Sequence, residues 1–141
     1  DLEQLLRPGS TKLVVTNLPH NPSGAVLSAD EFERLVLACS SCGCHLFVDE
    51  MYRELEHRHT LQWPISASTS TLPAACDAYP SGISLAGLSK TMGMPGLRIG
   101  WLASHDMSLM ERVGELKDFV SVCPPSPSEA LAVLAIRHRE Q

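Results

Sequence analysis

Apolar and polar positions alternate along this chain in blocks that predict strands and helices in turn. Short apolar runs rich in β-branched residues occupy residues 11–17, 45–50, 83–86 and 98–103, and each has the length of a strand. Turn-forming residues follow the first run, and two acidic residues end the second. The pattern therefore predicts four strands separated by segments that lack this strand pattern.

The segment between the first two strands has the signals of a helix at both ends. Ser28 and Glu31 form a capping box, and Gly43 supplies a stop. The apolar residues between them recur at helical spacing: Phe32, Leu35, Val36 and Cys39. A helix that begins after Ser28 and ends at Gly43 is therefore expected.

Two more helices are expected near the end of the chain, and one long loop before them. Residues 105–120 form an amphipathic pattern through Leu109, Val113 and Leu116. "SPSE" at residues 126–129 has the form of a second capping box, with Pro127 at the first helical position. Residues 59–82 contain proline, serine and threonine with little periodicity, which predicts a loop.

The order of these elements predicts an α/β fold. Strands that alternate with helices favour a mainly parallel sheet with helices on its faces. However, only residues 87–97 separate the last two strands, which is short for a helical crossover and favours an antiparallel pair. The expected architecture is a three-layer αβα fold with a mixed, mostly parallel sheet.

Composition narrows the class of protein further. With 141 residues, 44% hydrophobic and 19% charged, the chain is expected to form an ordinary globular domain with a core. A net charge of −5 argues against nucleic acid or an anionic membrane as partner, and no apolar run reaches the length of a membrane span. Five cysteines, an odd number without a secretory leader, favour reduced thiols and a cytoplasmic protein.

Polar residues gather where the predicted strands end, which is where ligands bind in open α/β sheets. Asn21 follows the first strand in a turn that contains proline and glycine, and Asp49 ends the second. Tyr52 lies one turn beyond Asp49, and Lys90 follows the third strand. Arg98 offers a planar guanidinium suited to phosphate. Taken alone, each has an ordinary explanation as a strand-end residue or a surface charge.

Four motifs in this order carry a family resemblance. "NLPHNPSG", "VDEMY", "LSK" and "GLRIG" resemble the signature of fold type I pyridoxal-5'-phosphate (PLP) enzymes, specifically the class I/II aminotransferases. Each motif is weak alone, but the four in order, with Lys90 and Arg98 at the family spacing, are specific. The matched region runs from about Thr11 to Ala103.

The resemblance implies a role for each of these residues. Lys90 is implied to bind PLP as a Schiff base and to carry the proton during transfer. Asp49 is implied to hold the pyridine nitrogen protonated, while Tyr52 and Asn21 bind the ring oxygen. Arg98 is implied to bind the phosphate, with Ser89 as a weaker candidate for the same contact.

One position departs from the family pattern, and other parts of the site are not in this chain. The family usually has a serine three residues before the lysine, and here that position is Gly87. The phosphate loop, the ring-stacking aromatic residue and the substrate-carboxylate arginine of the family have no match here. Both ends of the chain also have helical character. Residues 1–141 are therefore expected to be part of a large, PLP-binding domain, with the N-terminal segment and the C-terminal small domain absent.

Other candidate sites are weaker. Cys39, Cys42 and Cys44 form C-x-x-C-x-C, but Cys39 continues the apolar face of a helix and no fourth ligand has zinc spacing, so no metal is expected. His57 and His59 flank Arg58 in the predicted loop and are expected to be solvated.

Three functions remain open at this point. The first is an aminotransferase that moves an amino group from an L-amino acid to a 2-oxo acid and acts, as in the family, as a homodimer. The second is another fold type I chemistry, such as that of a lyase, a decarboxylase or an acyltransferase, because a fold does not decide function. The third is an inactive truncated fragment.

Overall fold

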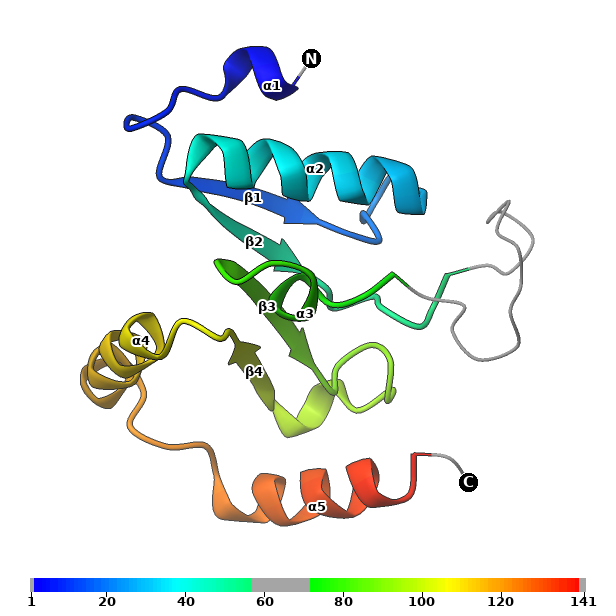
Figure 1. The fold of residues 1–141 in the computed structure, drawn as a ribbon. Helices are drawn as coiled ribbons and strands as arrows, with labels where there is room; N and C mark the ends of the chain where they lie inside the picture. Colours follow the sequence, from blue (N-terminus) through cyan, green and yellow to red (C-terminus); the bar gives the residue numbers. More distant parts are fainter. Residues whose placement is uncertain (1, 57–71, 140–141) are drawn as a thin grey trace.

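The computed structural model describes residues 2–56 and 72–139, and its centre is a four-stranded mixed sheet (Figure 1). The strands are β1 (Leu13–Asn17), β2 (His45–Asp49), β3 (Gly82–Gly87) and β4 (Gly100–Ala103), and they lie side by side in that order. The first three are parallel, and β4 runs antiparallel to β3. The predicted α/β class, the mixed sheet and the antiparallel pair are therefore confirmed.

The connection between β3 and β4 contains a 3₁₀ turn in place of a helical crossover. This turn, η1 (Pro95–Leu97), ends at Arg98, whose φ of 56° lies in the left-handed region. Since a residue in that conformation breaks the extended backbone, β4 begins at Gly100, two residues later than the sequence predicts.

Helix α2 (Ala29–Cys42) has both of the predicted end signals. The Ser28 hydroxyl accepts from the Glu31 backbone N–H, and the Glu31 carboxylate accepts from the Ser28 backbone N–H. At the other end, Gly43 adopts a left-handed φ of 69°. The Gly43 N–H donates to Ser40 and the Cys44 N–H donates to Cys39, which is the hydrogen-bond pattern of a Schellman motif.

Helix α2 covers one face of the sheet and makes the core with it. Phe32, Leu35 and Cys39 on the helix pack with Leu46 and Val48 of β2, all of them buried. Helix α3 (Ala75–Ala78) contributes to the same core, where the hydroxyl of the neighbouring Tyr79 donates to the Cys44 carbonyl at 3.0 Å. Since neighbouring side chains of a strand point to opposite faces, Phe47 and Asp49 face away from α2.

The cysteine cluster belongs to this core. Cys39, Cys42 and Cys44 are buried and have free thiols. Burial, and to a smaller extent the neighbouring Cys44 thiol, raises the pKa of Cys39 to about 12. Metals bind the thiolate form, so a thiol with this pKa is a poor ligand. Residues 2–56 and 72–139 contain no group of three or more side chains arranged to hold a metal ion.

The remaining helices differ from the sequence predictions in detail. A short helix, α1 (Leu2–Leu5), precedes β1, and α3 lies inside the segment predicted as a loop; residues 59–71 of that segment are outside the described residues. Helix α4 (Met107–Val120) forms as predicted, with Asp106 as its N-cap.

The second predicted capping box does not form. Helix α5 (Ser126–Arg137) begins one residue earlier than expected, with Pro125 as N-cap and no side-chain cap. The Glu129 N–H already bonds to the Pro125 carbonyl at 3.1 Å, so Ser126 is the first helical residue and cannot act as the cap.

Several apolar surfaces have no covering element among the described residues. On the sheet face opposite α2, Leu13 is 47% and Val15 64% exposed. Helix α4 has no buried residue, and Phe119 near its end is 90% exposed. No helix in the described residues has the length and apolar character needed to cross a membrane.

These surfaces lead to a prediction for the isolated chain. Residues 1–141, expressed alone, are expected to self-associate or to fold poorly, because burying the exposed apolar patches between copies is favourable. They are also expected to show no measurable transamination. Light scattering during size-exclusion chromatography, with a denaturant titration, measures this. A monodisperse monomer that unfolds cooperatively and converts an amino acid in the presence of PLP would contradict it.

Candidate active site

The predicted polar residues meet at the carboxyl edge of the parallel strands. Asn17 and Asp49 are paired across the ends of β1 and β2. The Asn17 side-chain amide donates to the Asp49 carbonyl at 3.3 Å, and the Leu18 N–H donates to the same carbonyl at 3.0 Å. These bonds continue the sheet pairing past the last residue of β1 and fix the loop that carries Asn21.

Asn21, Tyr52 and Lys90 lie together above this edge. The Asn21 side-chain amide donates to the Tyr52 hydroxyl at 3.0 Å, and the Asn21 backbone N–H donates to Asn17 Oδ1 at 3.0 Å. Lys90 Nζ lies 5.5 Å from the centroid of the Tyr52 ring, within cation–π distance. The structure therefore brings a phenol, an amide and an amine together from three separate loops.

Asp49 stands beside this group at the end of β2. Its side chain is half-buried, and Oδ1 accepts from the Met51 N–H at 3.0 Å. This local bond holds the start of the turn that carries Tyr52. The Asp49 carboxylate is therefore held in one orientation at the end of the strand. A carboxylate held in this way can pair with a cationic atom of a ligand.

The two predicted phosphate ligands are less firmly placed. Arg98 is exposed, and its guanidinium donates to the Pro95 carbonyl at 2.9 Å. Ser89 lies half-buried in the turn after β3. Within residues 2–56 and 72–139, no hydrogen bond joins Ser89 or Arg98 to Asn21, Tyr52 or Lys90. His57 and His59 lie outside the described residues.

The structure gives a physical reason for Gly87. A Cβ at this position would lie 2.9 Å from the Ile99 carbonyl oxygen and 3.1 Å from the Gly100 Cα, because β3 and β4 approach closely here. Both are backbone atoms, which cannot move aside without shifting β4. The serine that the family usually has at this position would therefore require the backbone around Ile99 and Gly100 to shift.

Gly87→Ser is therefore expected to destabilise the protein by about 1–3 kcal/mol without tightening PLP binding. Gly96→Ala is the matched control, because nothing lies within 4 Å of a Cβ there and it should be tolerated. The free energy of unfolding and the dissociation constant for PLP are measured for both variants in the full gene product. Tighter PLP binding by the Gly87→Ser protein at unchanged stability would show that the strands can separate.

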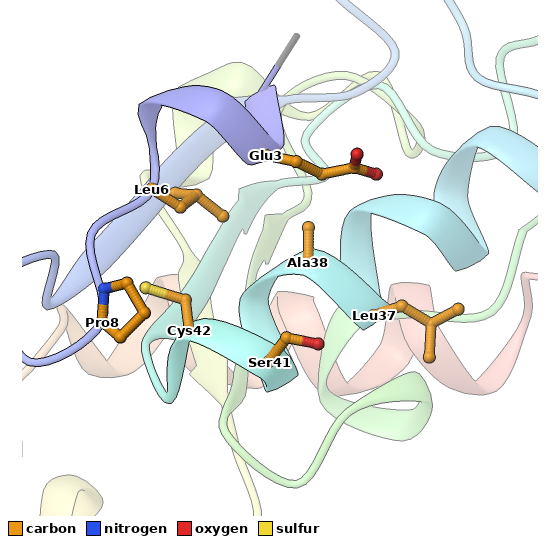
Figure 2. Close-up of a pocket in the computed structure, with 7 residues that line it drawn as sticks. All are labelled: Glu3, Leu6, Pro8, Leu37, Ala38, Ser41 and Cys42. Atoms are coloured by element: carbon orange, nitrogen blue, oxygen red, sulfur yellow. The ribbon is translucent and has the colours of Figure 1, made fainter.

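A hollow of about 300 Å³ lies elsewhere on the molecule (Figure 2). It lies between the N-terminal segment and α2 and is lined by Glu3, Leu6, Pro8, Leu37, Ala38, Ser41 and Cys42. The C-terminal end of α2 leads into the beginning of β2, so this hollow is near the edge of the sheet opposite Asp49. It contains none of the predicted site residues.

Three residues near the site were missed by sequence reasoning. Asn17 is the last residue of β1, and its bond to Asn21 could not be foreseen. Glu50 is in the motif "VDEMY" and Thr91 follows Lys90, yet neither has a local pattern that indicates a role. Their contacts join segments that are distant in the sequence.

Comparison with known proteins agrees with this arrangement. The family "Aminotransferase class I and II" matches residues 1–141. The chain is 31% identical over 128 residues to an L-aspartate:5-guanidino-3-methyl-2-oxopentanoate transaminase of Pseudomonas syringae, covering 89% of this chain and 31% of the relative. It is 30% identical over 139 residues to an aspartate aminotransferase of Sulfolobus acidocaldarius, covering 96% of this chain and 31% of the relative.

Solved structures of aminotransferases also match this fold. A PLP-dependent aminotransferase from Streptococcus suis superposes with a TM-score of 0.82 at 31% identity, over 99% of this chain and 33% of that one. The chain thus spans about a third of the length of the proteins it matches. Since the family match extends over all 141 residues and the motifs converge at one edge of the matching fold, the chain belongs to the class I and II aminotransferase family.

Proposed function

We propose that the full gene product containing this chain is a PLP-dependent aminotransferase, which transfers an amino group from an L-amino acid to a 2-oxo acid. The observation that supports this most strongly is the grouping of Lys90, Tyr52 and Asn21 at the strand edge that ends in Asp49. The membership of the chain in the aminotransferase family supports the reaction type.

The donor set fits PLP. The cofactor has an aldehyde, a ring oxygen, a pyridine nitrogen and a phosphate, and the chain offers an amine, an amide–phenol pair, a carboxylate and a guanidinium at or near one edge. In the proposed roles these groups are Lys90, Asn21 with Tyr52, Asp49, and Arg98 with Ser89. PLP bound here supplies a conjugated ring that withdraws electrons from the substrate bond that breaks.

The chain's own residues would carry out the rest. Lys90 Nζ would hold the cofactor aldehyde and would take and return the proton that moves during transfer. The Asn21 amide donates to the Tyr52 hydroxyl and so fixes its position, and this pair would bind the ring oxygen. The Asp49 carboxylate would bind the pyridine nitrogen and favour its protonated form. Because Met51 N–H holds one of its oxygens, this carboxylate has little freedom to turn away.

We further propose that the full protein acts as a homodimer on small-molecule amino acids and 2-oxo acids in a reducing, cytoplasmic compartment. The free thiols of all five cysteines support the compartment. No observation favours another fold type I reaction over transamination.

Absorbance and product analysis test this function. The full gene product, titrated with PLP, should develop the absorbance band of a lysine-bound cofactor. A panel of L-amino acids and 2-oxo acids should then yield a new amino acid and a new 2-oxo acid in equal amounts. Release of ammonia or carbon dioxide instead would identify a lyase or a decarboxylase. The lack of both band and product would overturn the proposal.

A further inference from the structure

A buried carboxylate stands directly after Asp49 and points to the other face of the sheet. Glu50 is only 6% exposed. Its Oε1 accepts from the Ser84 hydroxyl of β3 at 2.8 Å and from the Ala75 N–H at the start of α3 at 2.7 Å. Burying a carboxylate is unfavourable unless it is well paired, so Glu50 depends on these hydrogen-bond partners.

The same carboxylate is linked to the Lys90 loop through Arg53. Glu50 Oε2 lies 3.6 Å from the Arg53 guanidinium, and the Arg53 N–H donates to the Glu50 carbonyl at 2.9 Å. The Arg53 carbonyl in turn accepts from the Thr91 hydroxyl at 2.8 Å. Thr91 is the residue after Lys90, and Arg53 is the residue after Tyr52.

This link is unusual for the Lys90 loop. The other hydrogen bonds formed by residues 88–94, within the part of the chain that the structure describes, remain between residues 88 and 99. The bond from Thr91 to Arg53 therefore crosses to the turn that carries Tyr52, whereas the rest hold the loop only to itself and to the segment just before β4. Glu50, Arg53 and Thr91 also line one cavity of about 370 Å³.

We propose that Glu50 is a positioning residue, which acts through Arg53 and Thr91 to set the separation between Tyr52 and Lys90. Its carboxylate bonds to Ser84 of β3 and to the Ala75 N–H at the start of α3, which holds the turn that carries Tyr52 in place. The Thr91 hydroxyl then connects this turn to the Lys90 loop. A displacement of about 1 Å at a reacting group can lower a rate about 100-fold, so such an anchor has a measurable effect. This inference rests on the proposed function, because it concerns the placement of Lys90.

Two variants in the full gene product test the link at separate points. Glu50→Gln keeps a hydrogen-bond acceptor for Ser84 but removes the charge that faces Arg53, and Thr91→Val removes only the hydroxyl. Thr91→Ser, which keeps a hydroxyl, should restore the wild-type behaviour. Thr16→Val is the matched control, because Thr16 Oγ1 is buried with no hydrogen-bond partner among the described residues.

Hydrogen–deuterium exchange is the first readout, because it does not need PLP. Exchange of a peptide that covers residues 88–94 is expected to rise about tenfold in Glu50→Gln and Thr91→Val, while a peptide over residues 13–17 stays unchanged. The double variant should show no further rise, since both changes break one chain of contacts. Unchanged exchange at residues 88–94, or an equal rise over residues 13–17, would overturn the proposal.

The second readout is the bound cofactor. Both variants are expected to shift the pH at which the absorbance band of the lysine-bound cofactor changes, and to lower kcat about 10- to 100-fold with little change in KM. A normal pH titration and kcat in Thr91→Val would also overturn the proposal. If the wild-type protein itself binds no PLP, the proposed function fails, and the exchange measurement still decides whether Glu50 and Thr91 hold the loop.

Discussion

Replacement of Lys90 by alanine in the full gene product is expected to remove covalent PLP binding and to lower transamination about 10³- to 10⁴-fold or more. The chain then lacks both the amine that binds the cofactor and the group that moves the proton, and general acid–base catalysis alone contributes up to about 10⁴. The fold should persist, because Lys90 is exposed and its contact with the Tyr52 ring is worth only about 0.5–1 kcal/mol.

Borohydride reduction in the presence of PLP locates the reacting lysine directly. The chain has three lysines, and the cofactor should be found on the peptide that contains Lys90. Lys12 comes just before β1, at the opposite end of the parallel strands from Asp49, and Lys117 is on α4. Label confined to either of them would contradict the assignment.

Lys90→Arg is the sharper control. It keeps a positive charge over Tyr52, but a guanidinium stays protonated and cannot act as a nucleophile. Equal loss of activity in the arginine and alanine variants, with wild-type stability in the former, would separate the chemical role of the amine from its contact with the ring.

Replacement of Asp49 by asparagine is expected to lower kcat about 150- to 5,000-fold while some PLP remains bound. Removing one partner of a buried charge pair costs about 3–5 kcal/mol, and each 1.36 kcal/mol corresponds to a tenfold change in rate. Asparagine still offers an oxygen to the Met51 N–H, so the turn that carries Tyr52 should remain in place. The kinetic constants and the dissociation constant for PLP are measured together.

Asp49→Ala separates the charge from the hydrogen bond. It should lose activity as the asparagine variant does and, in addition, lower the free energy of unfolding by about 1 kcal/mol, because the Met51 N–H loses its partner. Near-normal turnover in both variants would show that Asp49 is only a structural residue at the end of β2.

Much of the candidate site could be predicted because its residues follow the ends of strands. The order of the strands in the sheet brings those ends to one edge, so Asn21, Tyr52 and Lys90 were expected to be neighbours. Their individual contacts were not predictable. The amide–phenol bond and the cation–π contact depend on the paths of three loops, and no spacing in the sequence encodes those paths.

For the fold too, some features could be predicted from the sequence and others could not. The sequence determined the ends of α2, because a capping box and a left-handed glycine act over three or four residues. It also determined that β3 and β4 are antiparallel, since the connection is too short for a crossover. The predicted start of α5 was one residue late. Two prolines flank Ser126, and either Pro125 or Ser126 could serve as the N-cap.

Tertiary structure alone decided three further features. The close approach of the backbone at Ile99 and Gly100 leaves no room for a side chain at Gly87 unless that backbone shifts. Glu50 points away from its neighbour Asp49, and Thr91 reaches the backbone of Arg53. Each joins segments brought together by the pairing or packing of strands. Local spacing in a sequence fixes local hydrogen bonds, whereas steric exclusion and buried pairing depend on which backbone lies opposite, and only the assembled sheet determines that.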